Sequence, residues 1–381
     1  MAKKILRFLL AVAVVFAMFG SLVSSAASPT VATVPCISGF GNAVRYVDAN
    51  TMSIQSSART SSADYSSLKL YPGGIPFGVK FMTEGVIVTG MCDVKTQNGK
   101  LCPANAAGLR PNDVLIKANG ITLTDAQTLT EITESSSGKA IELEFTRDGK
   151  AAKTTLTPAY CTEDGKYKTG MYVRDSGAGI GTVTYIMPET LSFGGLGHGI
   201  CDADTGKLTP MQRGSVVGVT INGVVKGLSG APGEVRGYFS SGKTGTLLQN
   251  TECGVFGAFA TLPKNLLLEP MPIGMRNELK SGKAYILSTL DGTQPKQYEV
   301  NISDIRISAM GNKCFTVKVT DKALLEKSGG IVQGMSGSPI IQNGKLVGAV
   351  THVLINDPTT GYGIFIENML NAANIPMAKA S

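Results

Sequence analysis

The chain has 381 residues, of which 46 are glycine, and it carries a formal net charge of +7. With 43% hydrophobic and only 17% charged residues it is too apolar for a disordered chain, and its glycines follow no triplet period that would indicate collagen. The glycine excess and the many short runs of Val, Ile and Thr predict a mostly β fold with tight turns, and the length predicts two globular units.

The N-terminus has the pattern of an export signal. Lys3, Lys4 and Arg7 precede an apolar stretch at 8–23, and small residues follow at 24–28. Residues 1–27 are therefore expected to be a signal peptide or an uncleaved membrane anchor, and the length of the stretch leaves both open. These three residues supply almost half of the net positive charge. The other Lys and Arg are scattered, so no nucleic-acid partner is expected.

A Ser-rich linker is expected at 28–70, followed by a small β domain at 71–158. That domain combines a β-run, a short helix, a helical pattern at 125–136 and a hairpin around Asp148-Gly149. It resembles a PDZ domain. The signature residues are Ala104, Ala107-Gly108-Leu109, Asp113, Leu115-Ile116 and Asn119-Gly120.

The PDZ resemblance implies binding of a peptide along a sheet edge, with a Gly-containing loop that offers backbone N–H groups. Phe77, Gly78 and Val79 occupy the expected place of that loop. Pro76 removes one N–H from it, which disfavours ordinary capture of a C-terminal carboxylate and leaves internal peptides open. The alternative is a module that only braces the rest of the chain.

Residues 159–381 alternate short β-runs with Gly turns, which predicts an antiparallel barrel or sandwich long enough for a double β-barrel. Strands are expected at 179–186, 214–223, 283–290, 313–320 and 344–355. One helix is expected at 321–330, with Asp321 at its start and Gly at its end.

The strongest candidate for catalysis is Ser336 in the run Gly334-Met335-Ser336-Gly337-Ser338-Pro339. Glycines around a Ser permit a tight, exposed turn in which the N–H groups of Gly334 and Ser336 form an oxyanion hole. A Ser loop that leads into a hairpin resembles chymotrypsin-like peptidases, whose motif is G-D-S-G-G-P. Met335 and Ser338 depart from that motif, and Met335 removes the acid used in trypsin-type zymogen activation.

A Ser nucleophile needs a base, and the chain has only His198 and His352. His198 lies between two glycines and precedes the Ser, which suits a base on one barrel and a nucleophile on the other. His352 lies in an apolar strand and is expected to be a packed or substrate-wall residue.

The orienting acid stays open at this point. Asp321 precedes Ser336 by 15 residues, but an equally good reading makes it the N-cap of a helix. Asp202 and Asp204 follow His198, and Asp357 follows His352. In chymotrypsin-like enzymes the acid lies much further upstream of the Ser, so a Ser–His dyad with a weak orienting group is the alternative.

Other features give weaker hypotheses. Ser229 also lies in a Gly-x-Ser-Gly run, but too close to His198 in sequence to enter a second barrel. The glycines at 177–181 precede a strand, so they are not a dinucleotide fingerprint. The seven Cys are expected to be mostly buried thiols, with pairing of Cys92 and Cys102 left open. No metal or other cofactor is expected.

Together these motifs resemble the SpoIVB-type serine peptidases with a PDZ domain, peptidase family S55. The matching runs are 174–186, 195–206 and 329–370 with the PDZ-like region before them. The resemblance implies Ser336, His198 and Asp321 as the triad. It also implies export to the space between the forespore membranes, self-cleavage, and cleavage of a membrane-held regulator of an intramembrane protease, which leads to activation of the late mother-cell sigma factor. Two rivals are a non-catalytic PDZ scaffold and a general exported quality-control protease.

Overall fold

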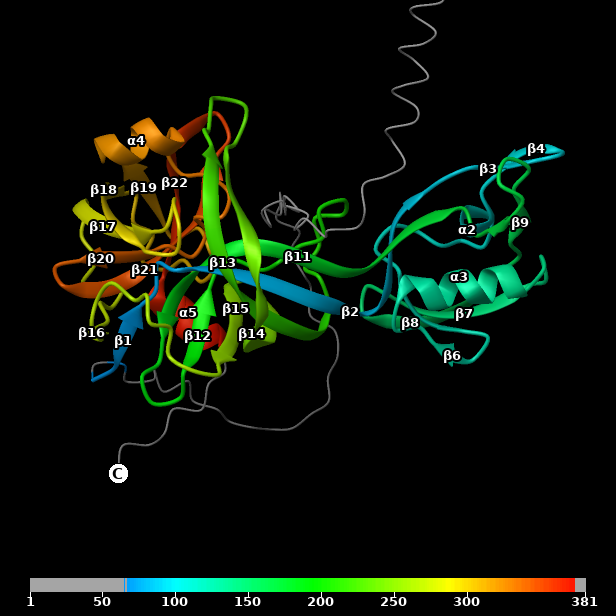
Figure 1. Cartoon of the computed structure of the whole chain (residues 1–381), viewed down its shortest axis with the longest axis horizontal. Helices are drawn as coiled ribbons and strands as arrows, with labels where there is room; N and C mark the ends of the chain where they lie inside the picture. Colours follow the sequence, from blue (N-terminus) through cyan, green and yellow to red (C-terminus); the bar gives the residue numbers. More distant parts are fainter. Residues whose placement is uncertain (1–64, 66, 374–381) are drawn as a thin grey trace, which may run out of the picture. The chain divides into compact units, whose positions relative to one another are not determined.

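The structure is a computed structural model that describes residue 65 and residues 67–373. The expected leader at 1–27, most of the linker at 28–70, and Cys36 lie outside the described residues. Figure 1 traces the described chain, in which strands far outnumber helices. Among these residues, no helix is long and apolar enough to span a membrane.

Six strands pair in a ring and form the first barrel, in the order β2, β11, β12, β15, β14, β13 and back to β2. Their bounds are β2 Pro76–Met91, β11 Met171–Ile186, β12 Ser192–Gly195, β13 Met211–Val225, β14 Glu234–Thr251 and β15 Gly254–Phe259. Two short strands, β1 (Lys69–Pro72) and β16 (Met271–Pro272), extend the sheet beyond β11. Alternating residues of these strands, such as Phe77, Val79 and Val216, fill the barrel core.

A second closed barrel of six strands follows, in the order β17-β18-β19-β22-β21-β20. Its strands are β17 Gly282–Ser288, β18 Lys296–Ser303, β19 Phe315–Val319, β20 Pro339–Gln342, β21 Lys345–Leu354 and β22 Asp357–Phe365. Helix α4 (Lys322–Ser328) connects β19 to the Ser336 loop, and α5 (Ile366–Ala372) follows the last strand. Asp321 caps α4 and Gly329 ends it with φ +75°, as the sequence predicts.

A third hydrophobic core, built from residues between Val86 and Met171, belongs to the PDZ-like module. Its strands are β3 Val94–Thr96, β4 Gly99–Leu101, β5 Val114–Ala118, β6 Ile121–Thr122, β7 Ile141–Arg147, β8 Lys150–Leu156, β9 Ala159–Tyr160 and β10 Tyr167–Lys168; its helices are α2 Pro103–Ala106 and α3 Ala126–Ser135. Asp125 caps α3, and Asp148-Gly149 forms the β7–β8 turn with positive φ at both residues. Within the module Asp113 is buried and bound by two nitrogens of Arg147.

The structure contradicts the predicted peptide-binding loop. Phe77, Gly78 and Val79 lie inside β2, where they pair with β11 on one side and β13 on the other. Phe77 and Val79 are almost fully buried, and a Cβ on Gly78 would lie 2.6 Å from the side chains of Val217 and Phe239. These residues have no free N–H edge to offer a peptide, because both edges of the strand are taken up by the barrel.

The predicted start of the PDZ-like module, at residue 71, differs from the structure for the same reason. Strand β2 begins in the first barrel, and only its second half, around Val86 and Val88, packs into the PDZ-like core. The chain returns to the barrel through β11, which pairs with β2 along both parts. The PDZ-like module is thus inserted into the first barrel, between strands β2 and β11.

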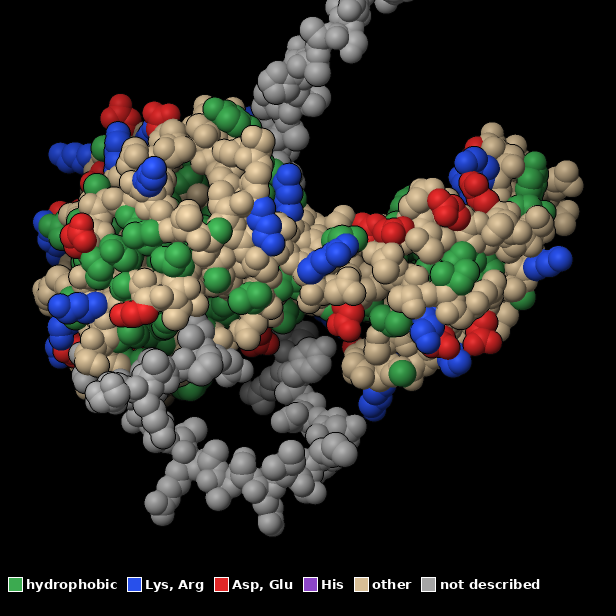
Figure 2. Space-filling view, turned by 60° about the horizontal axis from the view of Figure 1, so that its bottom comes forward, with side chains coloured by type: hydrophobic (Ala, Val, Ile, Leu, Met, Phe, Trp, Pro, Cys, Tyr) green, Lys and Arg blue, Asp and Glu red, His purple; other side chains and the backbone are tan. Residues whose placement is uncertain are grey.

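The predicted fold class is confirmed: the chain is mostly β, with a PDZ module and a chymotrypsin-like double β-barrel. The predicted strands and the helices near 125–136 and 321–330 are present, with bounds within a few residues of those expected except for β11, which begins at Met171 instead of residue 179. On the face drawn in Figure 2 the Lys and Arg side chains are scattered among acidic ones and form no continuous basic patch.

Candidate active site

The Ser336 loop connects α4 to β20, and the glycines nearest to the serine on either side have positive φ, +97° at Gly334 and +94° at Gly337. These conformations suit glycine, and they turn the chain sharply on either side of Ser336. At Gly337 the requirement is also steric. A Cβ there would lie 2.0 Å from the carbonyl oxygen of Thr182 and 2.5 Å from the nitrogen of Leu196.

The two expected oxyanion donors have fixed directions. The carbonyl of Gln333 accepts from the N–H of Val235 at 2.8 Å, and the carbonyl of Met335 accepts from the N–H of Ser338 at 2.9 Å. The described peptide bonds are all trans, so the following N–H groups, those of Gly334 and Ser336, point the opposite way. Within the described part of the chain neither N–H donates to a protein acceptor. Both donors are therefore free of protein partners, as the donors of an oxyanion hole must be.

Two threonines of the first barrel hold the loop in place. The hydroxyls of Thr182 and Thr184 donate to the carbonyls of Gly334 and Gly337, each at 2.8 Å. The N–H of Thr182 donates to the carbonyl of Ser336 at 3.0 Å. Sequence reasoning did not find these residues, because they lie about 150 positions before their partners and carry no local motif.

The hydroxyl of Ser336 donates to the backbone carbonyl of Thr351, at 2.7 Å. Thr351 belongs to β21, the second strand of the hairpin that follows the loop. In this structure the Ser336 hydroxyl proton is therefore held by a carbonyl, and no hydrogen bond joins Ser336 to His198. A rotation about the Ser336 Cα–Cβ bond is needed to free the hydroxyl for catalysis.

His198 lies directly after β12, in a loop where Leu196 and Gly197 have φ +65° and +69°. This loop packs on the Ser336 hairpin: a Cβ on Gly197 would lie 2.9 Å from Cγ2 of Thr351. His198 is buried, and its Nδ1 is 2.8 Å from the carbonyl oxygen of Gly199. A carbonyl only accepts, so Nδ1 carries the hydrogen and Nε2 keeps its lone pair for a proton.

The second histidine lies against the first. The ring centroids of His198 and His352 are 4.9 Å apart, with the ring planes inclined by 37°. Burial lowers the pKa of both rings, and the charge of His198 and that of Lys313 add to the effect on His352, whose pKa is about 3. Nδ1 of His352 is buried without a partner among the described residues. Both rings are therefore neutral at neutral pH, as a general base must be before it acts.

The structure does not bring Asp321 to His198. The Asp321 carboxylate accepts from the N–H groups of Leu324 and Glu299, at 3.0 and 3.3 Å, and so caps α4 and ties it to β18. The reading as a helix cap is confirmed. The resemblance-based role in a triad has no supporting contact among the described residues.

The other aspartates near the two histidines are also engaged elsewhere. Asp202 is buried, binds Arg174, and accepts from backbone and hydroxyl groups of its own turn. Asp204 pairs with Arg174 as well, at 2.7 Å. Asp357 accepts from Thr359 and Thr360 at the start of β22, and these bonds lower its pKa. None of these carboxylates hydrogen-bonds His198 in the described structure.

The hydroxyl of Ser229 donates to the carbonyl of Asn356 at 2.9 Å, and no hydrogen bond joins it to either histidine in the described structure. The six Cys that the structure describes are free thiols, Cys92 and Cys102 included. The described residues contain no cluster of three or more His, Cys, Asp or Glu that could hold a metal ion.

Comparison with known proteins decides the family. Residues 165–370, more than half of the chain, match the family model described as SpoIVB peptidase S55. The chain belongs to this family. As a SpoIVB-type S55 peptidase it is a serine endopeptidase, and the Ser336 loop lies within the matched range.

Solved structures give more distant similarities. The inactive form of the Rv3671c protease is 17% identical, covering 51% of this chain and 85% of its own, with a TM-score of 0.31. An inactive serine-to-alanine mutant of Rv3671c from M. tuberculosis is 15% identical, covering 53% and 84%, with a TM-score of 0.27. The PDZ domain of the SdrC-like protein from Listeria monocytogenes is 18% identical, covering 24% and 87%, with a TM-score of 0.20.

Proposed function

We propose that this S55 peptidase is an exported regulatory serine endopeptidase of sporulation, with Ser336 as its nucleophile and His198 as its general base. The single observation that supports the chemical part most is the pair of preset, unpaired N–H groups at Gly334 and Ser336. Family membership supports the biological part.

The reaction starts when the Ser336 hydroxyl turns from the carbonyl of Thr351 toward His198. Nε2 of His198 takes the proton as Oγ attacks the peptide carbonyl, and the N–H groups of Gly334 and Ser336 stabilise the oxyanion. The imidazolium then protonates the leaving amine, and water hydrolyses the acyl-enzyme by the same route. The carbonyl of Gly199 keeps the imidazole in the required tautomer throughout.

The substrates in this proposal are proteins. The peptidase first cleaves itself and then a membrane-held regulator of an intramembrane protease, which leads to activation of the late mother-cell sigma factor. It works in the space between the forespore membranes, which it reaches through the export signal at 1–27, and that segment anchors it if it is not removed.

Purified full-length chain and its Ser336→Ala variant test this function. On incubation, N-terminal sequencing is expected to find new N-termini in the unsubstituted protein and none in the variant. A fluorophosphonate should label Ser336, and unfolded casein should receive few cuts. An unlabelled protein would indicate a non-catalytic PDZ scaffold, and broad digestion of casein a quality-control protease; either result contradicts the proposal.

A further inference from the structure

The orientation of the His198 ring depends on one peptide group, the one that joins Gly199 to Ile200. Its carbonyl oxygen is 2.8 Å from Nδ1 of His198, and its N–H donates to Oδ1 of Asn250 at 2.8 Å. The described peptide bonds are all trans, so this carbonyl and this N–H point in opposite directions. The peptide group is therefore held from both sides, by the imidazole of His198 and by the side-chain amide of Asn250.

Asn250 lies near the end of β14, and three hydrogen bonds fix its side-chain amide. While Oδ1 accepts from the N–H of Ile200, Nδ2 donates to the carbonyls of Ile200 and Thr209, at 2.9 and 3.0 Å. The first bond requires an acceptor and the other two require a donor, so only one of the two orientations of the amide satisfies all three. Oδ1 cannot turn away from the peptide group without breaking the bonds that Nδ2 makes.

Gly199 allows the end of β14 to approach this peptide group closely. A Cβ on Gly199 would lie 2.6 Å from the carbonyl oxygen of Thr251 and 2.3 Å from Cδ1 of Leu208. Because Gly199 has no side chain, the segment that contains Asn250 and Thr251 packs directly on the base loop. A glycine at this position thus brings the Asn250 amide within hydrogen-bonding distance of Ile200.

In the part of the chain that the structure describes, no carboxylate does the work of this peptide group. Asp202 is bound by Arg174 and by groups of its own turn, and Asp321 caps α4. From β21 the neutral ring of His352 faces His198. The acceptor at Nδ1 of His198 is a backbone carbonyl, and its direction is set by whatever holds the peptide group.

We propose that Asn250 is a positioning residue that acts on His198 through the Gly199–Ile200 peptide group. By accepting from the N–H, Asn250 fixes the direction of the carbonyl and polarises the peptide group, which makes its oxygen a better acceptor for Nδ1–H. The carbonyl then keeps Nε2 free for the proton of Ser336 and stabilises the imidazolium that forms. This inference rests on the proposed role of His198 as the general base.

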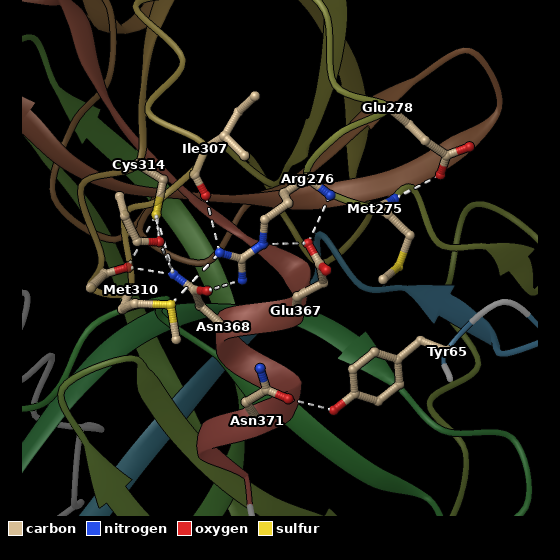
Figure 3. A network of polar contacts seen from close by, with 12 residues as sticks. Tyr65, Met275, Arg276, Glu278, Ile307, Met310, Cys314, Glu367, Asn368 and Asn371 are labelled. Carbon is tan, nitrogen blue, oxygen red and sulfur yellow. Dashed lines mark hydrogen bonds and ion pairs between the residues drawn. The ribbon is translucent and has the colours of Figure 1, made fainter. Parts of the chain in front are cut away.

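Asn312 offers a matched control, because it binds the same turn at a different point. Its Nδ2 donates at 2.8 Å to the carbonyl of Glu252, two residues after Asn250, and none of its hydrogen bonds in the described structure reaches the Gly199–Ile200 peptide group. Helix α5 holds the loop around Asn312 independently (Figure 3), since Asn368 donates to two carbonyls of that loop at 3.1 and 2.9 Å. Asn312→Ala should therefore loosen the turn and leave the peptide group in place.

The test measures the pseudo-first-order rate of fluorophosphonate labelling from pH 5 to 9 in the full chain and in its Asn250→Ala and Asn312→Ala variants. In Asn250→Ala the rate should fall about tenfold, as expected for the loss of an orienting hydrogen bond. Burial lowers the pKa of His198 and the Gly199 carbonyl opposes that effect, so a poorly oriented carbonyl should move the acidic limb of the profile to lower pH. Asn312→Ala should match the unsubstituted protein in rate and in profile.

A second readout is the tautomer of His198, which the NMR shifts of the imidazole nitrogens report and which is simple to assign because the chain has only two His. The unsubstituted protein and Asn312→Ala should hold His198 as the Nδ1–H tautomer, and the Nε2–H tautomer should appear in Asn250→Ala. An Nε2–H tautomer in the unsubstituted protein would overturn the inference, even if the Asn250→Ala chain did not fold.

An unchanged tautomer in a folded Asn250→Ala chain would also overturn the inference, whatever its labelling rate, because Asn250 would then only stabilise the loop. If Ser336→Ala were still labelled, the proposed function would fail instead. The two failures are therefore distinguishable.

Discussion

The imidazole rings of His198 and His352 lie in contact, 4.9 Å apart between centroids, although they come from different barrels and are the only two histidines of the chain. The pairing places one His of each barrel at the Ser336 loop. Burial lowers the pKa of both rings and favours their neutral forms, and at His352 the positive charges of His198 and Lys313 add to this effect.

Protein stability should therefore fall as the solution is acidified. The pKa of His352 is about 3 in the folded chain, against ~6.5 in an unfolded one. Between these pH values the unfolded chain binds more protons than the folded one. The contribution of neutral His352 to the free energy of unfolding is therefore complete above about pH 6.5. It is lost toward pH 3, at up to ~1.4 kcal/mol per pH unit. Urea unfolding at pH 7.5 and 5 measures this loss. His352→Gln should lose less stability over that interval, and an equal loss in the variant would contradict the account.

Substitutions of Asp321 separate helix capping from catalysis. Asn is about as good an N-cap as Asp, but its single side-chain oxygen replaces only one of the two acceptors, so Asp321→Asn should keep activity and lose less stability than Asp321→Ala. Asp321→Ala removes the acceptor for Leu324 and Glu299 and should cost about 1 kcal/mol of unfolding free energy with activity kept. Denaturant unfolding and peptidase assays decide this. A large loss of activity in the stable Asn variant would restore Asp321 as the triad acid.

Gly337 should tolerate no side chain. Both Gly337 and Gly344 have positive φ, which alone costs an Ala ~1–2 kcal/mol. At Gly337 the Cβ also meets the Thr182 carbonyl at 2.0 Å, whereas at Gly344 nothing lies within 4 Å. Gly337→Ala should therefore destabilise the protein more than Gly344→Ala and abolish activity. Thermal unfolding measures the loss of stability in each variant. Equal losses would contradict the close approach of residue 337 to the Thr182 carbonyl.

The position of Phe77 in the barrel core is testable in the same way. Phe77 is almost fully buried between Phe193 and the strands that flank β2, so Phe77→Ala should cost ~3–5 kcal/mol. Tyr172, which is 63% exposed on β11, is the matched control and should cost little when replaced by Ala. If Phe77→Ala left stability intact and only weakened peptide binding, the loop assignment made from sequence would be right after all.

Local features were predictable from sequence and long-range ones were not. The Ser336 turn is set by glycines within three residues of it, and α4 by the adjacent Asp321 and Gly329, so their local patterns suffice. Strand β2 is different, because an alternating apolar run suits a PDZ strand and a barrel strand equally well. Its partners are decided by β11 and β13, far along the chain. Thr182, which binds the Ser336 loop, escapes sequence reasoning for the same reason.

The most direct test of the account is fluorophosphonate labelling of the full chain and of its Ser336→Ala and His198→Ala variants, with peptide mapping of the labelled site. The account predicts a label on Ser336, none in Ser336→Ala, and a labelling rate reduced by several orders of magnitude in His198→Ala. Labelling at a different residue, or undiminished labelling without His198, would contradict the assignment of nucleophile and base.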